Sequence, residues 1–279
     1  MLISYNRPSI AWSLPGGGNW LTDADALTNG RPASASRLQW LTGAQTTASI
    51  LTLRGTWGAA LVPRVLCLLG LTLPVGTLIT LAFRRPADAG YTYLADVPIQ
   101  RVVQLPDGSR CAWFVLDAGL DAVIGVEYRI ANDVDGAASI AADSTFDVGE
   151  AWVGPTVEIL HEKGWKGWET DPSVVRRSLG SQVFASVRRA YRSLQLTFAF
   201  GQLPVVRGSG LANGMDWETL RATLRGAASA VVVPRFDTAA ELQRTALFGA
   251  AKVGDITHLT GPLYSSSLTI DEVPATAAP

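Results

Sequence analysis

The stretch VLCLLGLTLPVGTLITLAF, residues 65–83, decides between two very different folds for this chain. Its 19 residues carry no charge, and a run of that length raises the possibility of a membrane-spanning helix. Pro74 and Gly76 interrupt the run in its middle, however, where they form a turn signal. Each half is about nine residues long and rich in Val, Ile, Leu and Thr. We therefore predict two buried β-strands joined by a turn, and no membrane span.

Short apolar stretches separated by turn residues continue on both sides of this segment. Val102–Leu105 and Cys111–Leu116 flank Pro106-Asp107-Gly108-Ser109, in which Pro presets the turn and Gly accepts a positive φ, so a hairpin is predicted. Short strands at regular spacing are typical of a sandwich or barrel. The further strands predicted in this half are Ser49–Arg54, Arg64–Leu69, Thr77–Arg84, Ala122–Ile130 and Ala151–Leu160.

The composition changes near residue 161, where we predict a boundary between two domains. Residues 1–160 contain 10 basic and 14 acidic residues, whereas residues 161–279 contain 13 basic and 10 acidic residues. Residues 161–168 are polar and Gly-rich apart from two Trp, which is typical of a linker. The chain is thus predicted to be mainly β, with a β-sandwich domain at 1–160 and an α+β domain at 161–279.

The second half mixes strand and helix patterns. Leu194, Leu196 and Phe198 alternate with polar or small residues, which predicts a strand over Arg192–Phe200 beside another over Gln182–Arg189. A helix is predicted over Trp217–Ala228, with Asp216 as its N-cap. The remaining predicted strands are Ala230–Phe236, Phe248–Leu259 and Leu263–Val273.

The overall composition excludes several classes of protein. Hydrophobic residues make up 48% of the chain and charged residues only 17%, so disorder is excluded as the main state. A net charge of −1 does not favour a nucleic-acid partner. Two Cys are too few for a disulfide framework or a zinc site. The first residues do not form a signal peptide, and from this we predict synthesis in the cytoplasm. A surface with so little charge favours coverage by other subunits.

A search for catalytic and metal-binding patterns finds none. The chain has two His, no Gly-x-Ser-x-Gly elbow and no phosphate-binding loop after Gly16-Gly17-Gly18. The carboxylate pairs Asp23/Asp25 and Asp133/Asp135 could contact calcium, but exposed turn carboxylates explain them better. We therefore predict that the protein is not an enzyme and holds no cofactor or metal.

Aromatic and basic residues supply the candidate contact sites. Trp20, Trp40 and Trp57 lie in or near predicted loops and could stack on a sugar, although core burial or subunit contact would also explain them. This leaves open an alternative function as a carbohydrate-binding module that contacts a cell surface. Trp buries a large area, so Trp165 and Trp168 are candidate anchors of an interface between subunits.

Arginine dominates the basic residues, with 20 Arg against 3 Lys. A high-GC genome would produce this bias, and so would selection for interfaces, where Arg is enriched. Neighbouring residues on a strand point to opposite faces, so the densest basic region does not form one stripe for nucleic acid. Salt bridges to neighbouring subunits are the preferred interpretation for its members, which are Arg176, Arg177, Arg188, Arg189 and Arg192.

Four phrases in the sequence carry a resemblance to a known class of proteins. They are Leu21-Thr22-Asp23 with Leu27–Pro32, then Val65–Thr77, then Arg177–Phe184, and finally Ile270-Asp271-Glu272-Val273. In this order they resemble the galactose-binding-like β-sandwich proteins, of jelly-roll type, found in the tails and other virion parts of tailed bacteriophages.

The resemblance implies a structural role in the virion. It implies a ring with three-fold or six-fold symmetry at the distal end of the tail or in the baseplate, assembled from copies of this chain together with tail-tube and hub proteins. Large permanent interfaces are hydrophobic, which is consistent with the apolar composition.

Overall fold

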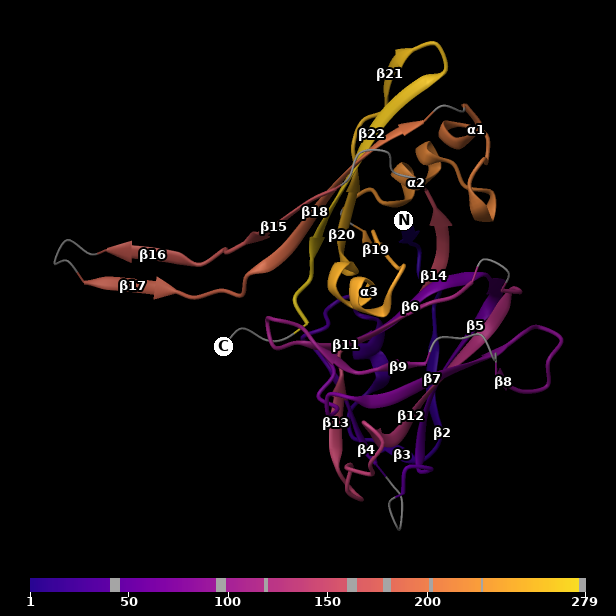
Figure 1. Ribbon diagram of the computed structural model, residues 1–279, viewed down its shortest axis with the longest axis vertical. Helices are drawn as coiled ribbons and strands as arrows, with labels where there is room; N and C mark the ends of the chain where they lie inside the picture. Colours follow the sequence, from indigo (N-terminus) through magenta and orange to yellow (C-terminus); the bar gives the residue numbers. More distant parts are fainter. Residues whose placement is uncertain are drawn as a thin grey trace.

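The computed structural model describes residues 1–40, 46–93, 99–117, 120–159, 165–177, 182–200, 203–226 and 228–275. Strands dominate these residues, as the sequence predicts, and they form sheets of eleven, six, three and two strands. Every strand pair is antiparallel (Figure 1). No helix among the described residues is long and apolar enough to cross a membrane.

The largest sheet runs through both halves of the chain. The N-terminal strand β1 pairs with β14 on one side and with β19 on the other, so it joins the strands of the two halves. The predicted division at residue 160 therefore falls within one continuous sheet. In spatial order its strands are β10 (Val103–Gln104), β11 (Arg110–Val115), β6 (Pro63–Leu69), β14 (Glu150–Glu158), β1 (Leu2–Ser4), β19 (Ser229–Val233), β20 (Leu247–Val253), β22 (Leu263–Glu272), β18 (Tyr191–Phe200) and β15 (Trp165–Thr170), with β21 (Thr257–Thr260) beside β22.

A sandwich forms where one end of this sheet packs on the six-stranded sheet. The six strands are β2 (Ala11–Gly16), β5 (Ile50–Leu61), β12 (Val123–Val134), β7 (Thr77–Arg84), β8 (Thr92–Tyr93) and β9 (Gln100–Arg101). Buried side chains such as Leu66, Leu81 and Phe114 fill the space between the layers. A three-stranded sheet adds to this half, with β13 (Thr145–Val148), β4 (Ser36–Trp40) and β3 (Gly18–Trp20), and a 3-10 helix, η1, spans Ala24–Thr28.

The uncharged segment 65–83 contributes two strands, as predicted. β6 and β7 belong to different sheets, so the turn between them carries the chain from one layer of the sandwich to the other. Gly76 has φ 87° in this turn, and a Cβ there would lie 2.3 Å from a carboxylate oxygen of Asp135. β6 is covered on both faces, with Leu66 and Leu68 in the sandwich core and Val65 and Cys67 in a second cluster. Burial on both faces explains why the segment has no polar alternation.

A second core lies between the sheet and short helices, and it includes Ile3 and Val157 of the first half beside residues of the second half. α1 (Leu203–Val206), η2 (Ala212–Gly214) and α2 (Trp217–Thr223) cover one face, where Trp217 packs on Phe198 with ring centroids 4.7 Å apart. α3 (Ala239–Thr245) covers the other face and packs into the cluster that joins both halves. The sequence patterns did not predict α3, although Thr238 caps it by accepting a hydrogen bond from the backbone N–H of Glu241.

Several predicted elements of the second half need correction. The predicted helix 217–228 ends at Thr223, and Gly226 follows with φ 72°. Phe248–Leu259 is divided into β20 and β21 around Gly254. The predicted linker 161–168 is wrong for Trp165–Trp168, because these residues belong to β15, and residues 161–164 lie outside the described part.

The strand predicted over Gln182–Arg189 does not pair with Arg192–Phe200. Its ordered part is β17 (Val183–Ser186), which pairs with β16 (Val174–Arg177), whereas β18 pairs with β15 and β22. The chain runs out along β15 and β16 and returns along β17 and β18, as in one long interrupted hairpin. β17 and β18 follow each other along the returning side of this hairpin. They therefore lie end to end and do not pair with each other.

Asp216 caps α2 as predicted, and this contact gives a direct test. Its carboxylate accepts a hydrogen bond from the backbone N–H of Thr219 at 2.8 Å. Burial works to raise the pKa of Asp216, but the backbone N–H groups of Gly208 and Thr219 outweigh it and lower the pKa to about 2. We expect Asp216→Ala to lower the free energy of unfolding in urea by about 1 kcal/mol. Asp216→Asn keeps the cap and should lose less, and equal losses would contradict the capping role.

Candidate functional site

A two-stranded hairpin projects from the body of the molecule. We call it the arm and define it as residues 171–177 and 182–190, which include β16 and β17 (Figure 1). β16 and β17 pair only with each other. At the base of the arm, the Ser173 hydroxyl donates to the Arg188 carbonyl oxygen at 3.0 Å and accepts from the Arg188 backbone N–H at 2.8 Å. The arm thus extends beyond the edge of the large sheet, and every residue of β16 and β17 is exposed.

Apolar side chains are exposed on both faces of the arm. Val175 is 64% exposed, Val187 62% and Phe184 59%. The register places Phe184 opposite Arg176 and Val183 opposite Arg177, so each face carries apolar side chains and one Arg. An isolated two-stranded hairpin is marginally stable in water at best. Burial by another surface would stabilise it.

The arginines predicted for subunit contacts separate into two groups. Arg189 pairs with Asp107 at 3.0 Å. The guanidinium of Arg192 pairs with Glu272. It also donates a hydrogen bond to the carbonyl oxygen of Arg244 in α3 at 2.8 Å. These two arginines therefore stabilise the fold of the chain itself. Arg176, Arg177 and Arg188 form no ion pair within the described part of the chain.

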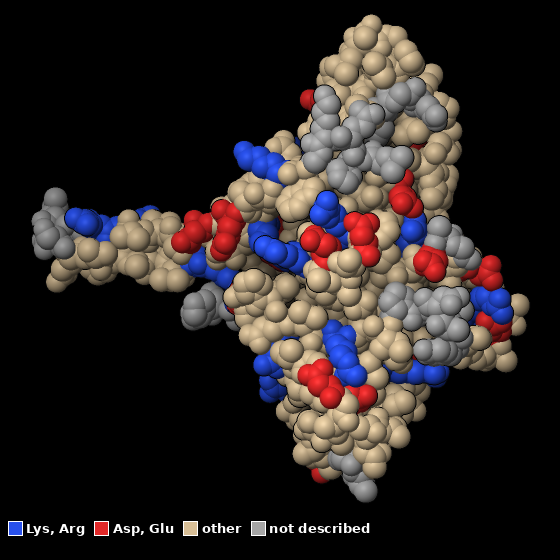
Figure 2. Space-filling view, in the orientation of Figure 1, with Lys and Arg blue, Asp and Glu red and all other residues tan. Residues whose placement is uncertain are grey.

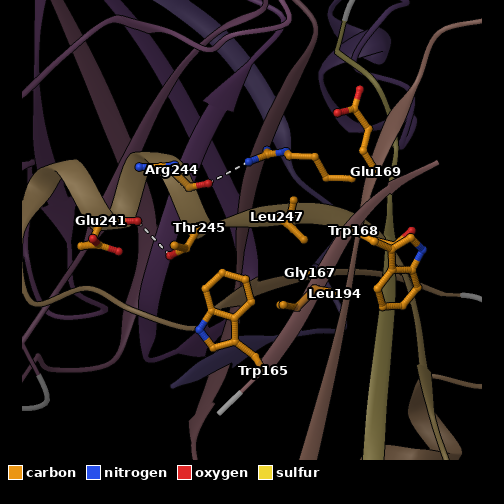
Figure 3. A pocket seen from close by; sticks show the side chains of 11 residues that line it. Trp165, Gly167, Trp168, Glu169, Leu194, Glu241, Arg244, Thr245 and Leu247 are labelled. Atoms are coloured by element: carbon orange, nitrogen blue, oxygen red, sulfur yellow. Dashed lines mark hydrogen bonds between the residues drawn. The ribbon is translucent and has the colours of Figure 1, made fainter. Parts of the chain in front are cut away.

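A groove lies at the base of the arm, between β15 and α3. It has a volume of about 370 Å³, and the buried side chains of Leu194 and Leu247 line it together with the exposed ring of Trp165 (Figure 3). The Trp165 ring lies across Gly167, where a Cβ would come within 2.8 Å of it. A glycine at position 167 therefore allows the ring to lie flat along the strand and form an apolar wall.

The two Trp of β15 do not form one contact surface. Strand alternation places Trp165 and Trp168 on opposite faces, and Figure 3 shows Trp165 directed towards α3 and Trp168 directed away from it. Lys166 lies with its Nζ atom 5.9 Å from the centre of the Trp168 ring. Both residues line the groove, but Trp165 is the one whose ring faces α3 (Figure 3).

Charged groups border the groove on two sides. Glu241 and Arg244 of α3 line it, and Glu169 of β15 lies at its end. Glu169 forms no ion pair among the described residues, and the nearest oxygen of Glu241 is 4.0 Å from Arg235. In Figure 2, acidic and basic atoms lie side by side around the base of the arm, whereas most of the visible surface is neutral. The groove therefore offers an apolar floor bordered by two carboxylates, Glu169 and Glu241, and by two guanidinium groups, Arg192 and Arg244.

The three Trp considered for sugar contact lie in different environments. Trp40 is fully buried, and Trp57 is 6% exposed with its ring N–H donating to the Val123 carbonyl oxygen at 3.0 Å. Both belong to the sandwich core, so their prediction as sugar-stacking residues is wrong. Trp20 in β3 is half-buried and packs against the same core.

The remaining reactive groups form no second site. The described residues hold no group of three or more His, Cys, Asp and Glu side chains that could bind a metal. Cys67 and Cys111 are buried free thiols, and burial raises the pKa of Cys111 to about 12. Neither a model of a known protein family nor a curated protein matches this sequence.

Proposed function

We propose that this chain is a structural subunit of a bacteriophage tail, which assembles with its own copies into a ring at the distal end or in the baseplate. The observation that carries the proposal is the arm. It exposes Val175, Val183, Phe184 and Val187, and among the described residues its strands β16 and β17 pair with no strand of the body. A permanent interface buries apolar surface of this kind, and a subunit that functioned alone would leave it in water.

The sandwich supports the same proposal. Two antiparallel layers packed around one core, with β6 and β7 crossing between them, are compatible with the galactose-binding-like jelly roll that the sequence resembles. The arm and the groove lie at different places on one chain, so a contact between them on successive copies is head-to-tail. Head-to-tail contacts close into a ring when the rotation allows it. A three-fold or six-fold ring, with tail-tube and hub proteins as neighbours in the virion, follows from the resemblance.

The alternative function as a carbohydrate-binding module has lost part of its basis. Two of the three Trp that could stack on a sugar are buried in the core. The burial of Trp40 and Trp57 therefore favours the structural role over the carbohydrate-binding one.

Immunoelectron microscopy tests the location of the protein. An antibody raised against the purified chain should label one end of the tail on phage particles. Labelling of the capsid, or of host cells without particles, would contradict the proposal.

Replacing Phe184 by Ser should reduce incorporation of the chain into tails. A central apolar anchor of an interface contributes about 2 kcal/mol or more, which corresponds to a roughly thirtyfold change in affinity. Tagged wild-type and variant chains would be supplied during infection, and the tag would be quantified in purified particles. Leu21→Ser is the matched control, since Leu21 is 48% exposed in the other half of the chain. Equal incorporation of all three chains would contradict an interface role for the arm.

A further inference from the structure

We infer that the groove between β15 and α3 receives the arm of a neighbouring copy of this chain, with Phe184 against Trp165 and Arg176 facing Glu241. The inference rests on the proposed function, because it requires the chain to contact its own copies. It adds the acceptor site and the residues that meet there.

The groove and the arm of one chain do not meet each other. β15 leads from the groove directly into the arm, which points away from the body in Figure 1. The eight extended residues from Thr170 to Arg177 span about 23 Å at roughly 3.3 Å per residue. This length carries the apolar part of the arm away from its own groove and towards the space that a neighbour would occupy.

One face of the arm matches the groove in chemistry, with an aromatic ring and a cation side by side. Phe184 and Arg176 lie directly opposite each other in the β16–β17 register and so project from the same face. The groove provides an apolar floor of Leu194 and Leu247 beside the Trp165 ring, with the Glu241 carboxylate on the adjoining wall. An aromatic side chain on this floor would bury the exposed ring of Trp165, and aromatic pairs attract each other beyond the effect of burial alone.

The charges favour the same pairing. Arg176 has no carboxylate partner in the described part of its own chain, and the closest cation to Glu241 is 4.0 Å away. Arg binds a carboxylate through two parallel hydrogen bonds, which fixes orientation as well as affinity. Docking therefore supplies Arg176 with the partner that the single chain does not provide.

A second hollow on the same side of the molecule fits the arm less well. It has a volume of about 790 Å³ and lies between β10 and α3, with Val103, Leu105 and Ala240 among its apolar walls. Its charged lining residues are Arg101, Arg192 and Arg244, and no Asp or Glu contributes to it. Arg192 and Arg244 line both hollows, but Glu169 and Glu241 line the groove beside Trp165 alone, so that groove is the better acceptor for Arg176.

Site-directed disulfide formation tests the contact in the purified full-length chain. A chain with Arg176→Cys would be mixed at high concentration with a size-tagged chain carrying Glu241→Cys and then oxidised, since the inference places these two positions opposite each other and keeps the Phe184 ring in place. Cys67 and Cys111 are buried and should not compete. We expect a mixed dimer to form at least tenfold faster than in a control mixture of Arg176→Cys with Asp25→Cys, because Asp25 is exposed and does not line the groove. A rate equal to that of the control would overturn the inference.

Charge reversal supplies a second measurement that does not depend on cysteine. Arg176→Glu and Glu241→Arg should each reduce incorporation into tails at least tenfold, and the chain with both changes should recover most of the loss. A chain that fails to fold could not be rescued in this way. Absence of rescue, together with control-level disulfide formation, would place the arm elsewhere. Antibody labelling of the tail would still support the proposed function in that case, so the two failures are distinguishable.

Discussion

Replacing Trp152 by Ala is expected to lower the free energy of unfolding by about 3–5 kcal/mol. Trp152 is 1% exposed and lies in β14, in the cluster that joins the two halves of the chain. Its ring N–H donates to the Ser4 hydroxyl at 2.9 Å, and its ring meets that of Phe248 edge to face at 5.6 Å. The substitution leaves a large cavity at the point where β1 connects both parts of the sheet. Urea unfolding followed by circular dichroism would measure the loss.

The matched control is Trp168→Ala. Trp168 is 38% exposed on β15, and surface substitutions usually change stability by less than about 0.5 kcal/mol. Similar losses for both variants would contradict the role of Trp152 at the junction.

We also expect the wild-type chain to unfold in one transition, because residues of both halves share one sheet and one buried cluster. Two separate transitions would instead support the division at residue 160.

Local sequence signals predicted much of the fold. The turn at Pro74 and Gly76 separates β6 from β7, and the predicted strand Thr77–Arg84 has the bounds of β7. The hairpin at Pro106–Ser109 is confirmed by the pairing of Val103 with Cys111. Each of these features depends on a few adjacent residues whose backbone preferences are strong, so periodicity and turn chemistry were sufficient.

Long-range pairing could not be predicted in the same way. β1 has only three residues, and its register joins Ile3 to Val157 and to Val232. A strand this short shows no periodicity, and nothing local identifies partners so distant in the chain. The two-domain interpretation missed the continuous sheet for this reason.

The candidate site was predicted in part. The Arg-rich region predicted for subunit contacts overlaps the arm, but adjacency in sequence suggested the wrong strand pairing. The groove escaped prediction because α3 is only seven residues long, although Thr238 and Glu241 have the spacing of a capping box. Trp40 and Trp57 resembled exposed aromatics because their short flanking segments gave no indication of burial.

Replacing Arg7 by Met should destabilise the protein strongly at alkaline pH and less at acid pH. Arg7 pairs with Glu150, whose side chain is fully buried and also accepts a hydrogen bond from the Gly30 backbone N–H at 2.9 Å. Removing one partner of a buried ion pair costs about 3–5 kcal/mol, because the remaining charge is left uncompensated. We expect a loss of this size at pH 8.

The direction of the pH dependence follows from Glu150. Burial raises the pKa of Glu150 from 4.5 to about 7, although Arg7 and the Gly30 N–H oppose that rise. Between pH 4.5 and about pH 7 the folded state therefore binds more protons than the unfolded state. The contribution of Glu150 to stability is greatest below pH 4.5 and is lost as the pH rises through about 7. Without Arg7 the pKa should rise further, and at pH 5 the carboxyl is neutral and tolerates its burial better.

Urea unfolding at pH 5 and pH 8 would measure this difference. Arg7→Met combined with Glu150→Gln should recover stability at pH 8, because no uncompensated charge remains in the core. Arg37→Met is the control, since Arg37 pairs with Asp147 at the surface, where such pairs contribute about 1 kcal/mol or less. If Arg7→Met loses the same free energy at both pH values, Glu150 does not titrate in this range. In that case the buried Glu150 carboxylate would be stabilised without Arg7. The hydrogen bond from the Gly30 N–H would be the first contact to account for this.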